Sequence, residues 1–332
     1  MLFCYVIRAY LAAVIFAVLA TAQTPNLIID TDAGSDDILA ISYLLSHPSV
    51  HIDAITIANG LAHVEAGARN LARLVEVSGR PNVPVFAGRP TPLKGNAEFP
   101  REWRKLADDL PGVQLPSSSR PPAQKTAADY LIEHLKDKKH VVRILALGPL
   151  TNLAEALKRD PSIAQSVKII VIMGGAIQVP GNLGDGGAYQ TNNKTAEWNI
   201  FVDPLAARIV FRSHIPILLV PLDATNKVPI DLAFLGEFKT RAISPLGRVA
   251  TQVLEADRES IDGKYFYAWD PLAAVALLHP EVIRSSRLHI DVLQDPPAEG
   301  RTAQTPGSPN ADVAMDADAA RFRKVFLEAF AK

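Results

Sequence analysis

The chain has 332 residues, of which 48% are hydrophobic and 21% are charged, and its formal net charge is −1. This length and apolar content suit one large globular domain with a sizeable core. The near-neutral charge argues against nucleic acid or an anionic membrane as a partner. The single cysteine, Cys4, lies in the leader described next, so the remaining chain has neither a disulfide framework nor thiol chemistry.

Residues 1–22 have the pattern of a cleaved secretory signal peptide. Arg8 makes the start of the chain positive, residues 11–20 form a short apolar run, and Ala20-Thr21-Ala22 is an A-x-A cleavage site. The alternative is an uncleaved anchor, but the apolar run is shorter than the ~20 residues that a spanning helix needs. We therefore predict a secreted or periplasmic protein, free of the membrane after cleavage, whose residues 23–332 form a single domain.

An acidic loop between a strand and a helix opens the mature chain. Residues 27–29 are apolar enough for a buried strand, and apolar residues recur at helical spacing from Ile38 to Leu45. Gly34 is predicted to supply the tight turn, and Ser35 or Asp36 to cap the helix. Four carboxylates lie between these two elements, namely Asp30, Asp32, Asp36 and Asp37.

Like charges packed this closely need a positive partner, and a hard divalent cation with oxygen ligands is the simplest one. The loop is not an EF-hand, because Ile41 stands at the twelfth position from Asp30, where a bidentate Glu is required. An Asp-x-Asp phosphatase loop is a closer alternative. It would need a small polar residue after Asp32 rather than Ala33-Gly34, and it leaves Asp36-Asp37 unexplained.

The following elements alternate between strands and helices, and residues 96–115 read as a long loop over a binding face. This alternation predicts a single-domain α/β fold: an open, mostly parallel, Rossmann-like sheet with helices on both faces and the active site at the carboxyl ends of its strands. Helices at 229–239 and 246–260 are expected to be scaffold around the rim, with 288–293, 313–315 and a last helix from Asp316 closing the sheet edge. The other predicted strands are 50–58, 83–85, 141–147, 167–173 and 215–220, and the other helices are 65–78 and 127–135.

Three motifs resemble the signatures of one enzyme family. They are Asp30-Thr-Asp-Ala-Gly-Ser-Asp-Asp37, Gly148-Pro-Leu-Thr-Asn152 and Ala196-Glu-Trp-Asn-Ile-Phe-Val-Asp-Pro204. They are similar to the nucleoside hydrolases, the N-ribohydrolases of the inosine-uridine family. Ala33 replaces the proline of the family pattern, which loosens the turn but removes no ligand. The resemblance covers residues 26–331 and is carried by motifs in the family's order.

The resemblance implies a Ca²⁺ site. By this likeness, Asp32 both binds calcium and acts as the general base on a water molecule, and Asp37 is a bidentate ligand. The remaining ligands would be the backbone carbonyl of Thr151 and the carboxylate of Asp270. On residue type alone, Thr151 and Asp270 also read as ordinary helix starts.

The resemblance also implies the ribose contacts. Asp36 would hold the 2′-hydroxyl and Met173 would touch the sugar. Glu197 and Asn199 lie two residues apart, so in an extended segment they share one face and suit O5′ and O3′. Asn193 is a further candidate, with Asn192 almost equal. Leu61 stands where the family has an Asn near the metal, and Asn59 is the candidate to replace it.

The leaving base would meet aromatic residues. Trp269 stands where the inosine-uridine type has the His that protonates the base, and this matches the purine-preferring branch. Trp103 would cover the base or merely pack the loop, and Glu102 or solvent would supply the proton. His63 could face the site, but an ordinary loop histidine is the favoured interpretation. The aromatic residues 265–267 could equally shape a broad pocket that accepts several bases.

We therefore expect calcium-dependent hydrolysis of ribonucleosides to ribose and free base, with purines preferred and a homodimer or homotetramer as the family implies. The alternatives are a non-specific or pyrimidine-preferring hydrolase, or a secreted ribose- or nucleoside-binding protein without turnover.

Overall fold

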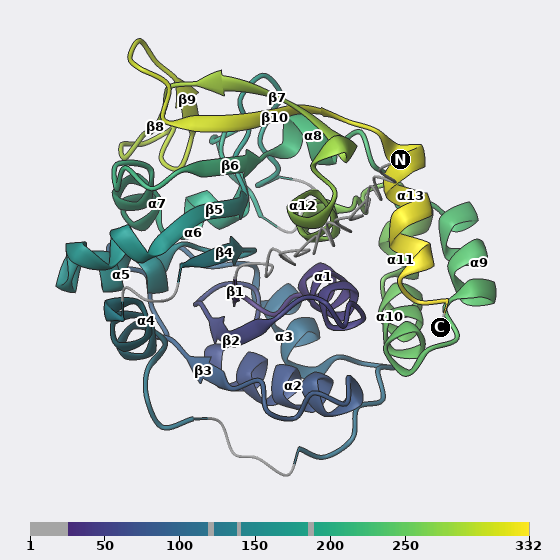
Figure 1. Ribbon diagram of the computed structural model, residues 1–332. Coiled ribbons are helices and arrows are strands. Elements are labelled where there is room, and N and C mark those ends of the chain that lie inside the picture. The colour runs from purple at the N-terminus through teal and green to yellow at the C-terminus, as the bar shows by residue number, and fades with distance from the viewer. Residues whose placement is uncertain (1–25, 119–122, 138–140, 185–188, 332) are drawn as a thin grey trace, which may run out of the picture.

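A computed structural model describes residues 26–118, 123–137, 141–184 and 189–331. The predicted signal peptide lies outside these residues. Eight strands form one sheet in the order β3-β2-β1-β4-β5-β6-β10-β7, parallel except for the last pair, and two more form a separate ladder (Figure 1). The strands are β1 Asn26–Thr31, β2 Ile52–Ile57, β3 Val85–Ala87, β4 Val142–Ala146, β5 Val167–Met173, β6 Ile217–Val220, β7 Ile283–Leu288, β8 Ile290–Val292, β9 Thr302–Gln304 and β10 Ala311–Ala317.

Helices cover both faces of this sheet, as expected from the sequence. They are α1 Ser35–Leu45, α2 Val64–Val77, α3 Arg101–Asp109, α4 Ala127–Lys136, α5 Thr151–Arg159, α6 Trp198–Val202, α7 Pro204–Phe211, α8 Leu222–Thr225, α9 Leu232–Arg241, α10 Pro245–Ala256, α11 Arg258–Asp262, α12 Trp269–Leu278 and α13 Ala319–Glu328, with the short 3₁₀ helices Pro161–Ser166 and Pro280–Val282. Among the described residues, none of these helices is long and apolar enough to cross a membrane.

The hydrophobic core has two halves, one on each face of the sheet. Because side chains alternate along a strand, Leu27 and Ile29 of β1 pack into one half and Ile28 packs into the other. The first half is closed by α1, α2, α10, α12 and α13, and the second by α4, α5 and α7 (Figure 1). The apolar run in β1 therefore reflects a strand that is buried on both faces.

The strand order reverses next to β1. The chain runs from β1 to β2 and β3 on one side, and then places β4 on the other side of β1. Open α/β sheets bind ligands where the order reverses, at the carboxyl ends of the strands. The loops after β1, β4 and β5 meet at this point, and they carry the predicted acidic loop and two of the family-like motifs.

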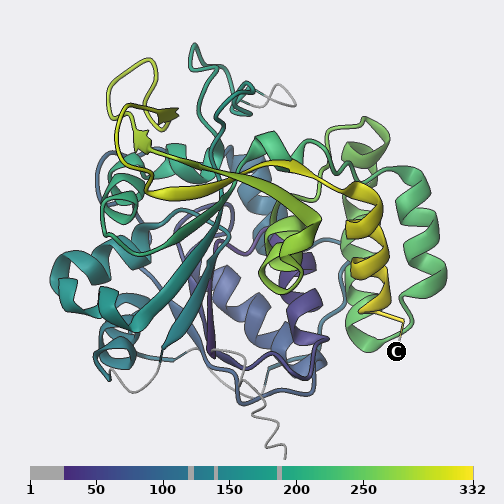
Figure 2. The same cartoon turned by 45° about the horizontal axis from the view of Figure 1, so that its top comes forward.

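Three predicted elements differ from the structure. Residues 96–115 contain α3 rather than a continuous loop, because its apolar residues Ala107 and Leu110 pack into the first core half. The predicted helix 246–260 is divided at Asp257 into α10 and α11. The edge strand next to β10 is β7, whereas residues 290–292 form β8, which pairs with β9 in a separate two-stranded ladder beside α7 (Figure 2).

Candidate active site

The acidic loop after β1 is folded by its own backbone and side chains. Ala33 adopts a left-handed conformation with φ of 59°, which a proline at this position could not adopt. Gly34 has an extended backbone and caps α1, in place of Ser35 or Asp36, and its amide donates to Asp37 Oδ2 at 2.9 Å. Asp37 also accepts from the Thr31 hydroxyl. These hydrogen bonds from the loop thus fix the position of the Asp37 carboxylate.

Two neighbouring loops close around Asp32, and both do so at glycines. Asp32 Oδ2 accepts a hydrogen bond of 2.8 Å from the amide of Leu61. A Cβ atom on Gly60 would lie 2.1 Å from this oxygen, and one on Gly148 would lie 2.8 Å from Asp32 Cβ. Glycine is needed at both positions because any side chain would displace the carboxylate. Asp30 is buried, and its Oδ1 accepts hydrogen bonds from the Thr56 hydroxyl at 2.6 Å and from the Asn152 side-chain amide at 2.8 Å.

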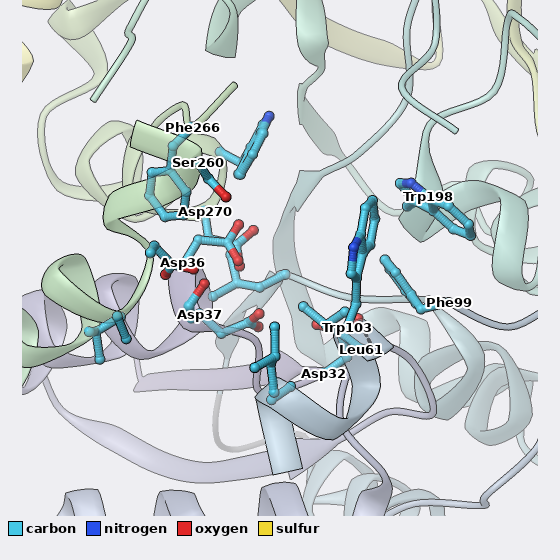
Figure 3. Close-up of a pocket in the computed structure, with 18 of the residues that line it drawn as sticks. Asp32, Asp36, Asp37, Leu61, Phe99, Trp103, Trp198, Ser260, Phe266 and Asp270 are labelled. Carbon is cyan, nitrogen blue, oxygen red and sulfur yellow. Dashed lines mark hydrogen bonds between the residues drawn. The ribbon is translucent and has the colours of Figure 1, made fainter. Parts of the chain in front are cut away.

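Asp270 completes an acidic cluster with Asp32, Asp36 and Asp37. Carboxylate oxygens of Asp36, Asp37 and Asp270 lie within 4.8 Å of one another, and their side chains point toward one another (Figure 3). Among the described residues, neither oxygen of Asp270 has a hydrogen-bond donor although both are buried. Buried carboxylate oxygens without donors are satisfied by a cation, and an all-oxygen donor set suits a hard metal ion.

Burial dominates the electrostatics of this cluster. It raises the pKa of Asp36 and of Asp37 to about 7, with neighbouring carboxylates as the next cause. The pKa values of Asp32 and Asp270 are raised well above the usual range by burial and then by the charges of the other acids. A bound cation would reverse these shifts, since it favours the charged form of each carboxyl group.

Polar groups from β5 and α6 face the cluster across the cavity. Glu197 is the N-cap of α6 and accepts from the amides of Asn199 and Gly175, both at 2.9 Å. The Asn199 side chain donates to the carbonyl oxygens of Leu147 and Met173. Glu197 and Asn199 are therefore brought together by a helix start and not by the predicted extended segment. Burial raises the pKa of Glu197 to about 7.

The cavity has a volume of about 470 Å³ and two helical walls. The α3 wall consists of Phe99, Trp103, Leu106, Ala107 and Leu110, with Trp198 behind Trp103. The α10–α12 wall consists of Val253, Ala256, Asp257, Glu259, Ser260, Tyr265, Phe266 and Trp269. Figure 3 shows Trp103 and Phe99 on one side of the acids, with Ser260 and Phe266 on the other. The largest side chains of the two walls are aromatic.

Both tryptophans of the predicted site are half-buried, so a ring face can remain available to a ligand. Trp103 meets Trp198 edge-on at a centroid distance of 5.8 Å, and Trp198 stacks on Phe99 at 4.7 Å. Trp269 meets Phe266 edge-on at 5.4 Å. Trp103 thus packs the α3 segment down and also lines the cavity, so both predicted roles are compatible with its position.

Most of the predicted site residues line this one cavity. They are Asp32, Asp36, Asp37, Trp103, Met173, Glu197, Asn199, Trp269 and Asp270.

Five other candidates do not belong to the lining that the described residues form. Glu102 is exposed on α3, and Asn59 is buried in the turn that follows β2. Asn193 uses its amide to hold its own loop, donating to Glu299 O and accepting from the Ala196 amide, while Asn192 is exposed. The Thr151 hydroxyl bonds to Asp203, and its residue is fully buried.

Leu147 and Asn182 are among the lining residues that the sequence analysis missed. Leu147 directly follows β4 and lines the cavity, whereas Thr151, four residues later, does not line it within the described residues. Asn182 lines the cavity and accepts from the Trp198 amide at 3.2 Å. Its signal was the Gly181-Asn182 pair shortly after Gly174-Gly175, which is a place of close backbone approach.

His63 lies away from the cavity, as the loop interpretation predicted. Its ring bonds to Asp108 of α3 at 2.6 Å, and its backbone amide donates to the same carboxylate. Asn70 of α2 donates to the carbonyl of Asp108 at 3.0 Å. These bonds fasten α3 to α2 and so position the α3 wall.

Comparisons with known proteins agree with this architecture. Residues 27–324 match the family described as inosine-uridine preferring nucleoside hydrolase. Uridine nucleosidase 1 of Arabidopsis thaliana is 38% identical over 77% of this chain and 75% of its own. A solved plant nucleoside hydrolase, PpNRh1, is 32% identical with a TM-score of 0.81, covering 92% of this chain and 99% of its own.

A purine-preferring ribonucleoside hydrolase from Gardnerella vaginalis is 27% identical with a TM-score of 0.77, over 92% of this chain and 98% of its own. The matched motifs, the strand order and the acidic cavity agree with these comparisons. The chain therefore belongs to the inosine-uridine preferring nucleoside hydrolase family and is a hydrolase of N-glycosyl compounds.

Proposed function

We propose that this hydrolase is calcium-dependent and prefers purine ribonucleosides. The observation that carries the proposal is one cavity in which the acidic cluster lies below two helical walls that carry Trp103 and Trp269. The oxygens of Asp270 without donors support a bound cation, and calcium is the hard cation that accepts several carboxylates in a flexible geometry.

Asp32, Asp37 and Asp270 would hold the calcium ion together with a backbone carbonyl. Leu147 is better placed than Thr151 to supply that carbonyl, because it lines the cavity and Thr151 does not within the described residues. When bound, calcium supplies positive charge that orients the substrate hydroxyls and a water molecule. Asp36 would bind the 2′-hydroxyl, and Glu197, Asn199 and Asn182 are available for the other hydroxyls of the ribose.

Asp32 is the proposed general base. The Leu61 amide holds one of its oxygens, which leaves the other to accept a proton from the attacking water. Attack on C1′ from the face opposite the base gives inversion, through a transition state with oxocarbenium character. Glu102 lies outside the cavity lining of the described residues, so we assign delivery of the leaving-group proton to solvent.

The base would lie against Trp269. An indole cannot donate a proton to a ring nitrogen of the base, but stacking against a purine raises the basicity of that nitrogen. A pyrimidine preference is the second candidate, because the Arabidopsis relative is named a uridine nucleosidase. The Gardnerella enzyme is named purine-preferring, which supports the first candidate.

The test is release of base from inosine and from uridine, with calcium and after chelation. We expect calcium-dependent release of hypoxanthine and little uracil. Equal release would overturn the purine preference, predominant uracil would establish the second candidate, and full activity after chelation would overturn the role of calcium.

We also propose that residues 1–22 are removed on export and that the mature enzyme acts outside the cytoplasm as a homodimer or homotetramer. Amino-terminal sequencing of exported protein should begin at Gln23, and its mass in solution gives the oligomeric state. An intact Met1 on exported protein would contradict the cleavage.

A further inference from the structure

The α10–α12 wall contains a carboxylate that the proposed reaction does not use. Asp257 joins α10 to α11 and lines the cavity. The Ser35 side chain hydrogen-bonds to its carboxyl group. One carboxylate oxygen of Asp257, Oδ2, is shielded from solvent and has no hydrogen-bond partner within the geometric limits among the described residues. An unpaired buried carboxylate oxygen is costly, so such an oxygen in a cavity wall indicates that a ligand donates to it.

The position of Asp257 indicates which part of a nucleoside supplies the donor. Groups that suit ribose hydroxyls, such as Asp36, Glu197 and Asn199, lie at the strand ends and at the start of α6. Asp257 instead belongs to a wall whose large residues, Phe266 and Trp269, are aromatic. That surface is complementary to the heterocyclic base, and the base carries N–H groups on its edge.

We propose that Asp257 is a specificity-determining residue that accepts a hydrogen bond from an N–H group of the base. The inference rests on the proposed function and deepens it, because it names bases with a ring N–H, such as hypoxanthine, guanine and uracil, as preferred. It holds for purines and pyrimidines alike. Burial raises the pKa of Asp257 to about 6, so the carboxyl group remains largely ionised at neutral pH and can accept.

The test compares paired substrates that differ in the N–H donor. Inosine is compared with purine riboside, which lacks the N1–H group, and uridine with 3-methyluridine. The substitution Asp257→Ala should lower kcat/KM for inosine or uridine by about 10- to 100-fold, as expected for losing a hydrogen bond to a charged group. It should change kcat/KM for the analogue of each pair by less than about threefold.

Two further variants keep the comparison interpretable. Asp257→Asn preserves the shape and an oxygen acceptor, so it guards against misfolding and should show a smaller loss of the same selectivity. Asp262→Asn removes a carboxylate from the same helix outside the cavity lining and should behave as wild type. An equal loss on both members of each pair would overturn the proposal, since Asp257 would then only hold Ser35 and the acidic loop.

Hydrolysis of 4-nitrophenyl riboside separates this proposal from the function on which it rests. Its leaving group has no N–H donor, so Asp257→Ala should leave its hydrolysis nearly unchanged. If the wild-type protein cleaves neither this riboside nor any nucleoside, the proposed function fails. If it cleaves them and the selectivity within each pair is unchanged in Asp257→Ala, only the role of Asp257 fails.

Discussion

The two ends of the cavity are built in different ways. The acidic end takes three of its four carboxylates from eight consecutive residues, Asp30 to Asp37, and adds Asp270 from the start of α12. The aromatic end is assembled from α3, α10, α11 and the start of α12, which lie far apart in the sequence. The position of the strand ends therefore determines the acidic end, and the packing of helices above those ends determines the aromatic end.

This difference separates the chemistry from the choice of substrate. The backbone packs closely against the acids, as Gly60 and Gly148 do around Asp32. A side chain added at either glycine would displace the carboxylate. The walls meet the cavity through helical side chains such as Trp103 and Trp269, which are half-buried, so substitution there alters the shape of the cavity more than the fold. We therefore expect variants at the acidic end to affect all substrates and variants at the aromatic end to affect particular bases.

The largest expected effect is at the acidic end. Asp32→Asn keeps the shape and an oxygen that can accept from the Leu61 amide, but it removes the proton acceptor. Turnover should fall about 1,000-fold, on nucleosides and on 4-nitrophenyl riboside alike, because general base catalysis contributes about 10²- to 10⁴-fold. Steady-state rates measure this, with thermal unfolding as the check on folding. A near-wild-type rate would remove Asp32 as the base.

The second effect is at the aromatic end and should depend on the base. Trp269→Ala should lower kcat/KM for inosine by about 10- to 100-fold, the range expected for losing one aromatic stacking contact of 1–3 kcal/mol. Hydrolysis of 4-nitrophenyl riboside should change little, because its leaving group needs no protonation. Trp269→Phe is the matched control and should retain most of the activity. An equal loss on both substrates would contradict activation by stacking.

The smallest effect is on stability and concerns the metal-free protein. The pKa values of Asp36 and Asp37 rise from 3.8 to about 7 on folding, so the folded state binds more protons than the unfolded state between about pH 4 and pH 7. Stability is then fully present at the acid side of this window and falls as pH rises through it. Chelated protein should therefore melt at a lower temperature at pH 8 than at pH 5.

Asp270→Asn sharpens this measurement because it removes one of the repelling charges. In chelated protein at pH 8 it should raise Tm by about 2–4 °C, equivalent to about 1 kcal/mol for a chain of this size, and at pH 5 it should have little effect. With calcium present the same variant should be less stable than wild type. A variant that is less stable without metal at pH 8 would show that Asp270 is satisfied without a cation.

The sequence was sufficient to predict the fold class and most of the acidic end. The buried strand, the acidic loop and the helix at 26–45 are local signals, since periodicity and turn residues are read from neighbours in the chain. It was less reliable where backbone positions matter. Among the described residues, Leu147 lines the cavity and Thr151 does not, and Asn182 lines it and Asn193 does not, because a shift of a few residues along a loop moves a group to another surface.

The sequence by itself determined the alternation of strands and helices that gives the α/β fold class, the acidic loop and the family. Only the tertiary structure decided that α3 forms a wall, that α10 and α11 line the cavity, and that Glu102 faces solvent. The physical reason is the distance in sequence between the residues that interact. Hydrophobic periodicity and turn residues reflect interactions between near neighbours in the chain. The side of a helix that lines a cavity depends instead on packing against elements that lie far away in the sequence.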